Sequence, residues 1–207
     1  MSTGHEDRSF ISKNRLEALV DSVFAFAMTL LVVSLAIPAI PRSEAAAELP
    51  AYLARMYPEF VSFLVAFLLL AIFWIVHHRQ FHSLHTVDSG VLWLNIGILI
   101  CIVLVPFTTS ISGDYSYVQI AVVLFHLNLL AIGLFFTAHW YYISHMPALT
   151  EHAISGQAAR CGLLRSLVTP VVALIGIALS FFVPDHSMLA YLLIPVGVYL
   201  VRRSSCR

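Results

Sequence analysis

The sequence predicts an all-α, polytopic membrane protein with six transmembrane helices, and three observations lead to this fold class. Of the 207 residues, 60% are apolar and only 11% are charged, whereas soluble domains have about 45–50% and about 25%. The mean hydropathy is +0.90. Six separate runs approach the length of about 20 apolar residues that spans a bilayer. We therefore expect residues 1–207 to form one transmembrane domain whose main solvent is lipid.

The first three runs are bounded by polar residues or proline. The first, residues 16–37, is stopped by Pro38. It is too long for the core of a signal peptide and lacks a small-x-small cleavage site, so we interpret it as a retained helix. The second, residues 59–76, continues as an amphipathic extension through His85. The third covers residues 91–111.

The last three runs are bounded in the same way. The fourth covers residues 117–144 and is closed by Pro147, and the fifth covers residues 164–183 and is closed by Pro184. The sixth, residues 187–201, is short. We expect it to be lengthened by snorkelling of the two arginines that follow it.

The distribution of basic residues predicts that both termini are cytoplasmic, because cytoplasmic loops carry the excess of Lys and Arg. With six spans and the N-terminus inside, all but two of the eleven basic residues fall on the cytoplasmic side. The two exceptions are Arg42 and Arg55. The cytoplasmic set is Arg8, Lys13, Arg15, Arg79, Arg160, Arg165, Arg202, Arg203 and Arg207.

Several functional classes are excluded or disfavoured. Eleven basic and eleven acidic residues cancel, so no polybasic field attracts nucleic acid. The chain has no GxSxG, HExxH or P-loop motif, and we expect neither an enzyme nor a cofactor. The three cysteines show no metal-binding spacing and no readable disulfide framework. The TVGYG filter of many potassium channels is also missing.

One face of the first run is unusual. Ser22, Phe26, Thr29, Val33 and Ala36 follow the helical period and form one stripe. Two hydroxyls and small neighbours on one face suit a narrow pore, or they let another helix approach closely. The period alone favours helix packing over a pore.

Polar residues inside the apolar runs need partners. Asp21 must face protein or water, because an unpaired carboxylate in lipid costs a few kcal/mol. Alternatively, its carboxylate lies at the membrane interface and only stabilises the N-terminus of the helix. Asn95, Trp74 and His77 lie at the same expected depth as Asp21. For the histidines at positions 77, 78, 82 and 85 we favour hydrogen bonding over metal binding, and for His126, Asn128 and His139 we favour interhelical hydrogen bonds.

The first run resembles a known signature. The endolysosomal potassium channel family (transmembrane protein 175) begins its first helix with an Arg-x-x-x-Phe-Ser-Asp motif. Arg15 and Asp21 match that motif, whereas Leu19 and Val20 replace its Phe and Ser. The similarity is densest over residues 15–110. It also includes residues 23–32, 73–78 and 93–95 and the Val105-Pro106-Phe107 turn.

This resemblance implies a homotetramer of six-helix subunits in which the first helix lines a central pore. Selectivity then comes from rings of side chains rather than from a carbonyl filter. The pore positions of the family correspond to Phe26, Thr29 and Val33, which lie on the stripe with Ser22, and this reverses the preference in favour of a pore. Phe26 is bulkier than the Ile or Leu that usually forms the narrowest ring of the family.

The resemblance also implies a structural polar network at the base of the first three helices. The matching residues are Arg15, Asp21, Trp74, His77 and Asn95. Because Val20 replaces the serine of the motif, one hydrogen-bonding member of this network is lost.

The sequence thus predicts a passive, potassium-selective channel in the bacterial inner membrane. Potassium is the permeant ion, and the expected partners are three further copies of the chain and membrane lipid. Two alternatives stay open. The ten histidines and Asp21 also suit a proton-conducting pathway or a proton-coupled transporter. A membrane-packing protein without transport is the third possibility.

Overall fold

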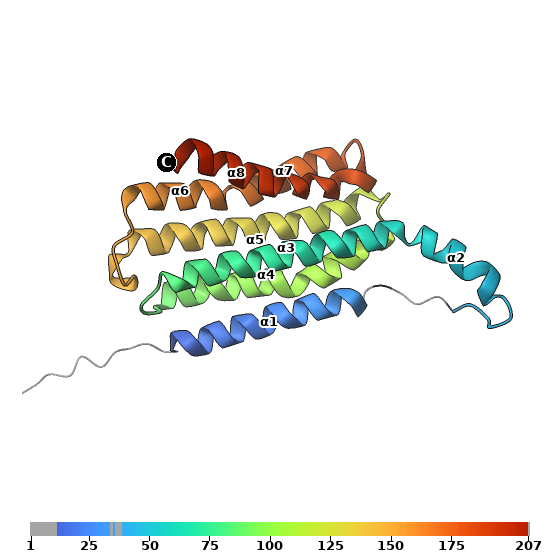
Figure 1. Cartoon of the computed structure of the whole chain (residues 1–207), viewed down its shortest axis with the longest axis horizontal. Coiled ribbons are helices and arrows are strands. Elements are labelled where there is room, and N and C mark those ends of the chain that lie inside the picture. Colours follow the sequence, from blue (N-terminus) through green and yellow to red (C-terminus); the bar gives the residue numbers. More distant parts are fainter. Residues whose placement is uncertain (1–11, 34, 36–38, 207) are drawn as a thin grey trace, which may run out of the picture.

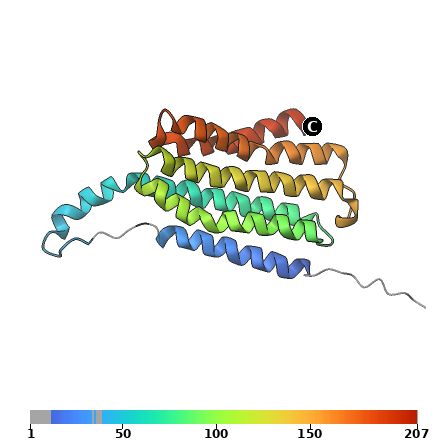
Figure 2. The same cartoon turned by 180° about the vertical axis from the view of Figure 1, so that it is seen from behind.

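The computed structural model describes residues 12–33, 35 and 39–206, which form a bundle of helices lying side by side (Figure 1). The helices are α1 (Lys13–Val33), α2 (Ala45–Arg55), α3 (Tyr57–His82), α4 (Ser89–Asp114), α5 (Gln119–His145), α6 (Gly156–Ser166), α7 (Val168–Ser180) and α8 (Leu193–Ser205), with 3-10 helices η1 (Pro147–Leu149) and η2 (Pro184–Leu192). Helix α2 projects away from the bundle, as the view from behind also shows (Figure 2).

Six stretches of the described chain are long and apolar enough to cross a membrane. They are α1, α3, α4, α5, the combined stretch Gly156–Ser180 and the combined stretch Pro184–Ser205. The chain is therefore a multi-pass membrane protein. The bilayer explains this architecture, because a helix satisfies its own backbone hydrogen bonds where no water can do so.

Some helix boundaries differ from those expected from the sequence. Helix α1 ends at Val33, and residues 34 and 36–38 lie outside the described part of the chain. The turn expected at Val105-Pro106-Phe107 is wrong, because Pro106 lies inside the continuous helix α4. Membrane helices tolerate an interior proline where neighbouring groups satisfy the freed backbone carbonyl.

The two C-terminal spans are each built from two helical pieces. The fifth changes from α6 to α7 around Leu167, so it begins at Gly156, well before the expected position 164. The sixth begins as η2 at Pro184 and becomes the α-helix α8 only at Leu193. Hydropathy averages over such breaks and cannot locate them.

A disulfide joins Cys161 of α6 to Cys206 at the end of α8, with their Cα atoms 5.4 Å apart. This pairing corrects the expectation that no disulfide framework could be read. The two cysteines lie 45 residues apart in sequence, and only the antiparallel packing of α6 and α8 brings them together. Cys101 is free and buried.

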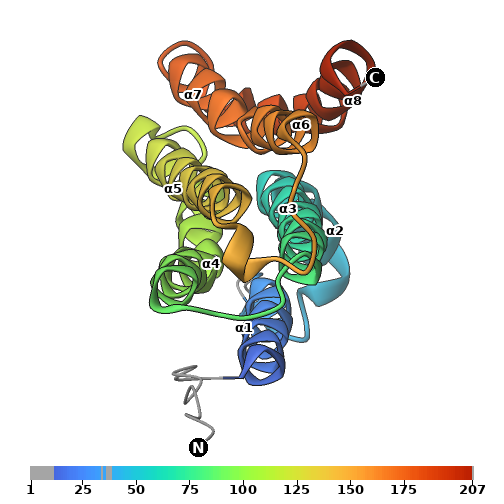
Figure 3. The same ribbon diagram turned by 90° about the vertical axis from the view of Figure 1, so that its left-hand side faces the viewer.

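The core lies between the middle helices. Ile98 and Ile102 of α4 and Phe125, Leu129 and Ile132 of α5 are all fully buried. Figure 3 looks along the bundle and shows α1 at one margin of the cross-section, α6, α7 and α8 at the opposite margin, and α3, α4 and α5 between them. Helix α1 packs against α3 and α4, so most of its surface has no partner among the described residues.

One end of the bundle carries most of the basic residues, and we call it the basic end. Helix α1 begins there, α3, α5 and α8 end there, and α4 and α6 begin there (Figure 1). Asp88 caps α4 by accepting a hydrogen bond from the Val91 amide at 2.8 Å, and it accepts a second from the Tyr142 hydroxyl at 2.7 Å. These contacts hold α4 and α5 in register at this end.

Candidate ion pathway

Helix α1 has a buried face and an exposed face. The buried side chains repeat with the helical period and pack into the bundle; they are Leu16, Val20, Phe24, Ala27 and Leu31. The sequence-predicted stripe of Ser22, Phe26, Thr29 and Val33 is exposed over its described length. Ala36, also placed on this stripe, lies outside the described residues. The structure therefore turns the stripe away from the subunit's own core.

The two hydroxyls on this face are held in a defined orientation. Ser22 Oγ donates to the Ala18 carbonyl at 2.7 Å, and Thr29 Oγ1 donates to the Phe26 carbonyl at 2.8 Å. A hydroxyl that donates to its own helix keeps two oxygen lone pairs free. Each oxygen can therefore accept a hydrogen bond from water or coordinate a cation, and its hydrogen points elsewhere.

Two large apolar side chains flank the threonine. Phe26 is 70% exposed and Val33 is 74% exposed. The seven-residue interval between them corresponds to about 10 Å along the helix axis. The exposed face of α1 thus presents an apolar group, a hydroxyl and a second apolar group in sequence along the axis.

The polar residues near the base of α1 form two separate pairs. Trp74 Nε1 donates to Asp21 Oδ1 at 2.8 Å, which joins α3 to α1. His77 Nε2 lies 2.8 Å from Asn95 Oδ1, which joins α3 to α4 in the buried core. Asn95 Nδ2 is buried without a hydrogen-bond partner in the described structure. Arg15 is exposed on α1, outside both pairs.

The other histidines near the end of α3 point outward. His78, His82 and His85 are exposed, whereas His77 is buried. Among the described residues, no group of three or more His, Cys, Asp or Glu side chains is arranged to hold a metal ion.

The polar residues of α5 make the interhelical hydrogen bonds expected from the sequence. His126 Nδ1 lies 2.8 Å from the Tyr191 hydroxyl and its Nε2 lies 3.0 Å from Ser187 Oγ. Asn128 Nδ2 donates to the Cys101 carbonyl at 3.1 Å. His139 Nδ1 lies 2.7 Å from Gln80 Oε1. The partners Gln80, Ser187 and Tyr191 were not identified from the sequence, because nothing in one helix specifies which neighbour faces it.

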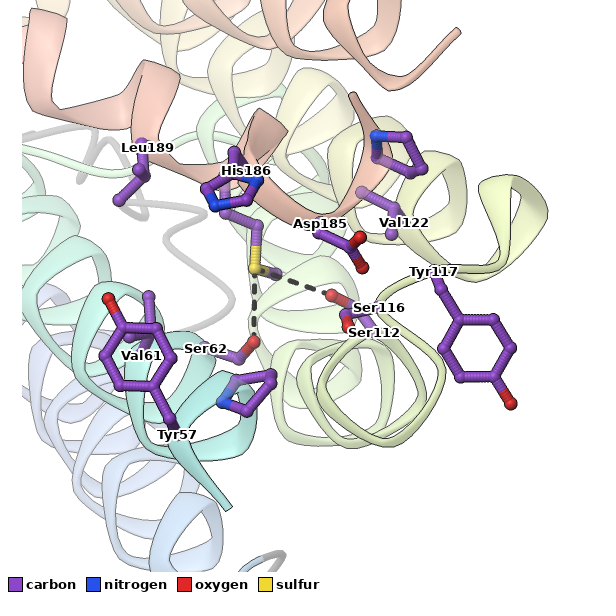
Figure 4. A pocket seen from close by; sticks show the side chains of 13 residues that line it. Tyr57, Val61, Ser62, Ser112, Ser116, Tyr117, Val122, Asp185, His186 and Leu189 are labelled. Carbon is purple, nitrogen blue, oxygen red and sulfur yellow. Dashed lines mark hydrogen bonds between the residues drawn. The ribbon is translucent and has the colours of Figure 1, made fainter. Parts of the chain in front are cut away.

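A hollow near the opposite end of the bundle is not on α1. A cavity of about 400 Å³ lies between α3, α4, α5 and η2 (Figure 4). Ser62 and Ser112 point into its floor, and both hydroxyls donate to the Met188 sulfur, at 3.3 and 3.5 Å. These contacts attach η2 to α3 and α4, so we interpret this region as one that stabilises the packing of η2 and not as part of an ion pathway.

Comparison with known proteins places these features in a family context. The sequence profile of the endosomal/lysosomal potassium channel TMEM175 matches residues 15–106, which include most of α1, all of α2 and α3, and most of α4. A potassium channel of Streptomyces collinus is 29% identical over 187 residues, covering 85% of this chain and 88% of the relative. The human endosomal/lysosomal proton channel TMEM175 is 30% identical over 142 residues, covering 67% of this chain but only 28% of the human protein.

A solved structure resembles the whole bundle. It is the crystal structure of a homologue, from Chamaesiphon minutus, of the lysosomal potassium-selective channel TMEM175. It superposes with a TM-score of 0.76 and 25% sequence identity, covering 93% of this chain and 97% of the other.

Proposed function

Because this chain belongs to the TMEM175 family, in its bacterial branch, we propose that it is a potassium-selective channel that conducts passively through a pore lined by α1. The observation that carries this proposal is the exposed face of α1, where two back-bonded hydroxyls lie among apolar side chains. The hydrogens of these hydroxyls are satisfied by carbonyls of α1 itself, but their oxygen lone pairs would find no donor or cation in lipid. They are suited to a water-filled path that admits cations.

The pore requires several copies of the chain. One subunit offers a single exposed stripe at the margin of its bundle (Figure 3), and one helix face cannot enclose a path. Four copies of α1 around a central axis would place Ser22, Phe26, Thr29 and Val33 as stacked rings. We therefore propose a homotetramer, with α6, α7 and α8 facing the surrounding lipid.

The rings have different roles in this proposal. Thr29 oxygens contact the permeant potassium ion, because their lone pairs face away from the helix. Phe26 and Val33 form apolar constrictions, which resist water and so act as barriers to ions. The pairs Asp21–Trp74 and His77–Asn95 tie α1, α3 and α4 together and hold the pore helix in place.

The orientation follows from the basic end. Lys13, Arg79, Arg160, Arg202 and Arg203 lie at or near that end, whereas Arg55 lies in the projecting α2 at the other. Cytoplasmic loops carry the excess of basic residues, so we propose that the basic end and both termini face the cytoplasm. In a bacterium the protein then lies in the inner membrane.

Reconstitution in liposomes tests the function. Under a potassium gradient we expect a flux that is larger for potassium than for sodium and a reversal potential that follows the potassium gradient. Protein-free liposomes are the control. Absence of cation flux from correctly inserted protein would contradict the proposal and favour the membrane-packing alternative.

Proton conduction is a second candidate, favoured by one observation: the human relative is named as a proton channel. A pH-sensitive dye inside the same liposomes separates the two functions. If protons move with no potassium or sodium flux, the second candidate replaces the first.

A further inference from the structure

A second cavity lies near the basic end, away from α1. It has a volume of about 340 Å³ and lies between α3, α5, α6 and α8. Its wall combines apolar side chains with two arginines; the residues that matter here are Ile72, Ile75, Val76, Val198, Arg79 and Arg165. Among the described residues, no Asp or Glu contributes to the lining. The cavity therefore carries positive charge that its own wall does not balance.

The apolar and charged parts of the wall are segregated along α3. Arg79 lies three residues before the helix ends at His82, and Ile72 lies ten residues before that end. The seven residues between them correspond to about 10 Å along the axis. The part of the wall that α3 supplies is thus apolar toward the middle of the bundle and cationic toward the basic end, which is the polarity of a lipid molecule in one leaflet. Arg165, in the last turn of α6, adds the second positive charge.

The shape of the cavity is held by rigid contacts. Gly162 of α6 packs directly on the ring of Trp140, where any larger residue would collide with the indole. Trp140 Nε1 donates to the Ala159 carbonyl at 2.9 Å, which fixes α6 against α5. Gln80, on the α3 side, donates to the Phe136 carbonyl at 3.3 Å. The hollow between these helices is therefore built into the packing.

We propose that this cavity binds an anionic phospholipid. The phosphate lies between Arg79 and Arg165, whose guanidinium groups suit phosphate oxygens, and the acyl chains follow Ile75 and Val198 into the bilayer. Basic pockets between membrane helices bind anionic head groups in this way. A neutral lipid would leave the two cationic groups without a counter-charge, and free phosphate would leave the apolar wall unfilled.

This inference does not depend on the channel proposal. The cavity is lined by α3, α5, α6 and α8 and by no described residue of α1, and Figure 3 shows α6 and α8 at the margin of the bundle opposite α1. Lipid binding is measured without any ion flux, so failure of one proposal leaves the other intact.

The test is native mass spectrometry of the whole chain in a neutral detergent, titrated with phosphatidylglycerol or phosphatidylcholine. We expect tighter binding of phosphatidylglycerol, and the preference should shrink as salt rises. The double variant Arg79→Gln/Arg165→Gln should weaken phosphatidylglycerol binding by about 25-fold, since each arginine near the membrane surface contributes about a fivefold factor. The exposed Arg55→Gln on α2 is the matched control and should bind like the parent.

Three results would overturn the proposal: equal binding of both lipids by the parent, unchanged binding by the double variant, or displacement of phosphatidylglycerol by millimolar inorganic phosphate. If the glutamine variant does not fold, Arg79→Lys/Arg165→Lys replaces it. That pair keeps both charges and should retain the preference for the anionic lipid, and loss of the preference would contradict a charge-based site.

Discussion

Helices α1 and α7 lie at opposite margins of the same bundle, yet their exposed faces differ in chemistry. Each lies in a membrane span that is only slightly buried within the bundle. Of the 18 residues in the most apolar part of the span, 28% are buried for α1 and 22% for the α6–α7 stretch. The exposed side chains of α7 are all apolar: Val171, Leu174, Ile175, Ala178 and Leu179. The serine of α7, Ser180, is buried and donates to the Ile177 carbonyl at 2.7 Å.

Helix α1 reverses this arrangement. Its buried face is entirely apolar, and its hydroxyls, from Ser22 and Thr29, are on the exposed face. An apolar outer face needs no partner other than lipid. A face with hydroxyl oxygens needs hydrogen-bond donors or cations, which water and ions supply and lipid chains do not. From this contrast between two helices of similar burial we propose two surroundings, lipid around α7 and an aqueous path beside α1.

The largest expected effect concerns the inner face of α7. Replacing Gly176 by Val places a Cβ about 2.6 Å from the His126 ring, which two hydrogen bonds hold in place. We expect a loss of about 3 kcal/mol in stability from this overpacking, measured as a lower melting temperature in detergent. Gly156→Val is the control, because nothing lies within 4 Å of its added Cβ. Equal melting of the two variants would show that α7 is not packed as described.

The next effect concerns the apolar barrier on α1. Phe26→Ala should raise cation flux by about tenfold and weaken the discrimination between potassium and sodium. The reason is that four alanine side chains around the pore axis leave a wider constriction, which admits water. Phe182→Ala is the control, since Phe182 is 83% exposed and follows α7. Both are measured by liposome flux with each cation. If the two variants behave alike, the contrast between the faces has no functional meaning.

Thr29→Val tests whether the hydroxyl on the exposed face of α1 contributes to potassium selectivity. It removes the hydroxyl at nearly constant size, and we expect the preference for potassium over sodium to fall by about fivefold, because the ion loses its oxygen ligands. Thr137 of α5 also donates to its own helix, to the Gly133 carbonyl at 2.7 Å. Thr137→Val should therefore leave the ratio of potassium to sodium flux unchanged. An unaltered ratio in the Thr29 variant would exclude this hydroxyl from the ion path.

The smallest expected effect concerns the attachment of α1. Asp21→Ala removes the hydrogen bond from Trp74, and interhelical hydrogen bonds in membranes average about 0.6 kcal/mol. A double-mutant cycle with Trp74→Phe, read as melting temperature and as the fraction of assembled protein, should give a coupling of that size. No measurable coupling would mean that this pair does not hold α1 in place.

Much of the fold could be predicted from the sequence because the bilayer imposes a simple rule of length and hydropathy. The breaks inside the last two spans could not, since they depend on contacts such as that of His126 with Tyr191 of η2. The Cys161–Cys206 disulfide was missed for a similar reason, because spacing along the chain says little about distance between helix ends.

The candidate site was predictable in part. The helical period alone places Ser22, Phe26 and Thr29 on one face, and the structure exposes that face. Which polar residues pair was not predictable, because pairing depends on how neighbouring helices are rotated. Asp21 meets Trp74, while His77 turns inward to Asn95.

The most direct test of the central claim is chemical modification of the two exposed faces during conduction. Phe26→Cys and Leu174→Cys are each reconstituted and treated with a charged, water-soluble thiol reagent; the free native Cys101 is buried. If the exposed face of α1 lines the pore, the reagent should block potassium flux through the Phe26→Cys protein and leave the Leu174→Cys protein unchanged. Undiminished flux through Phe26→Cys protein that mass spectrometry shows to be modified would contradict the account.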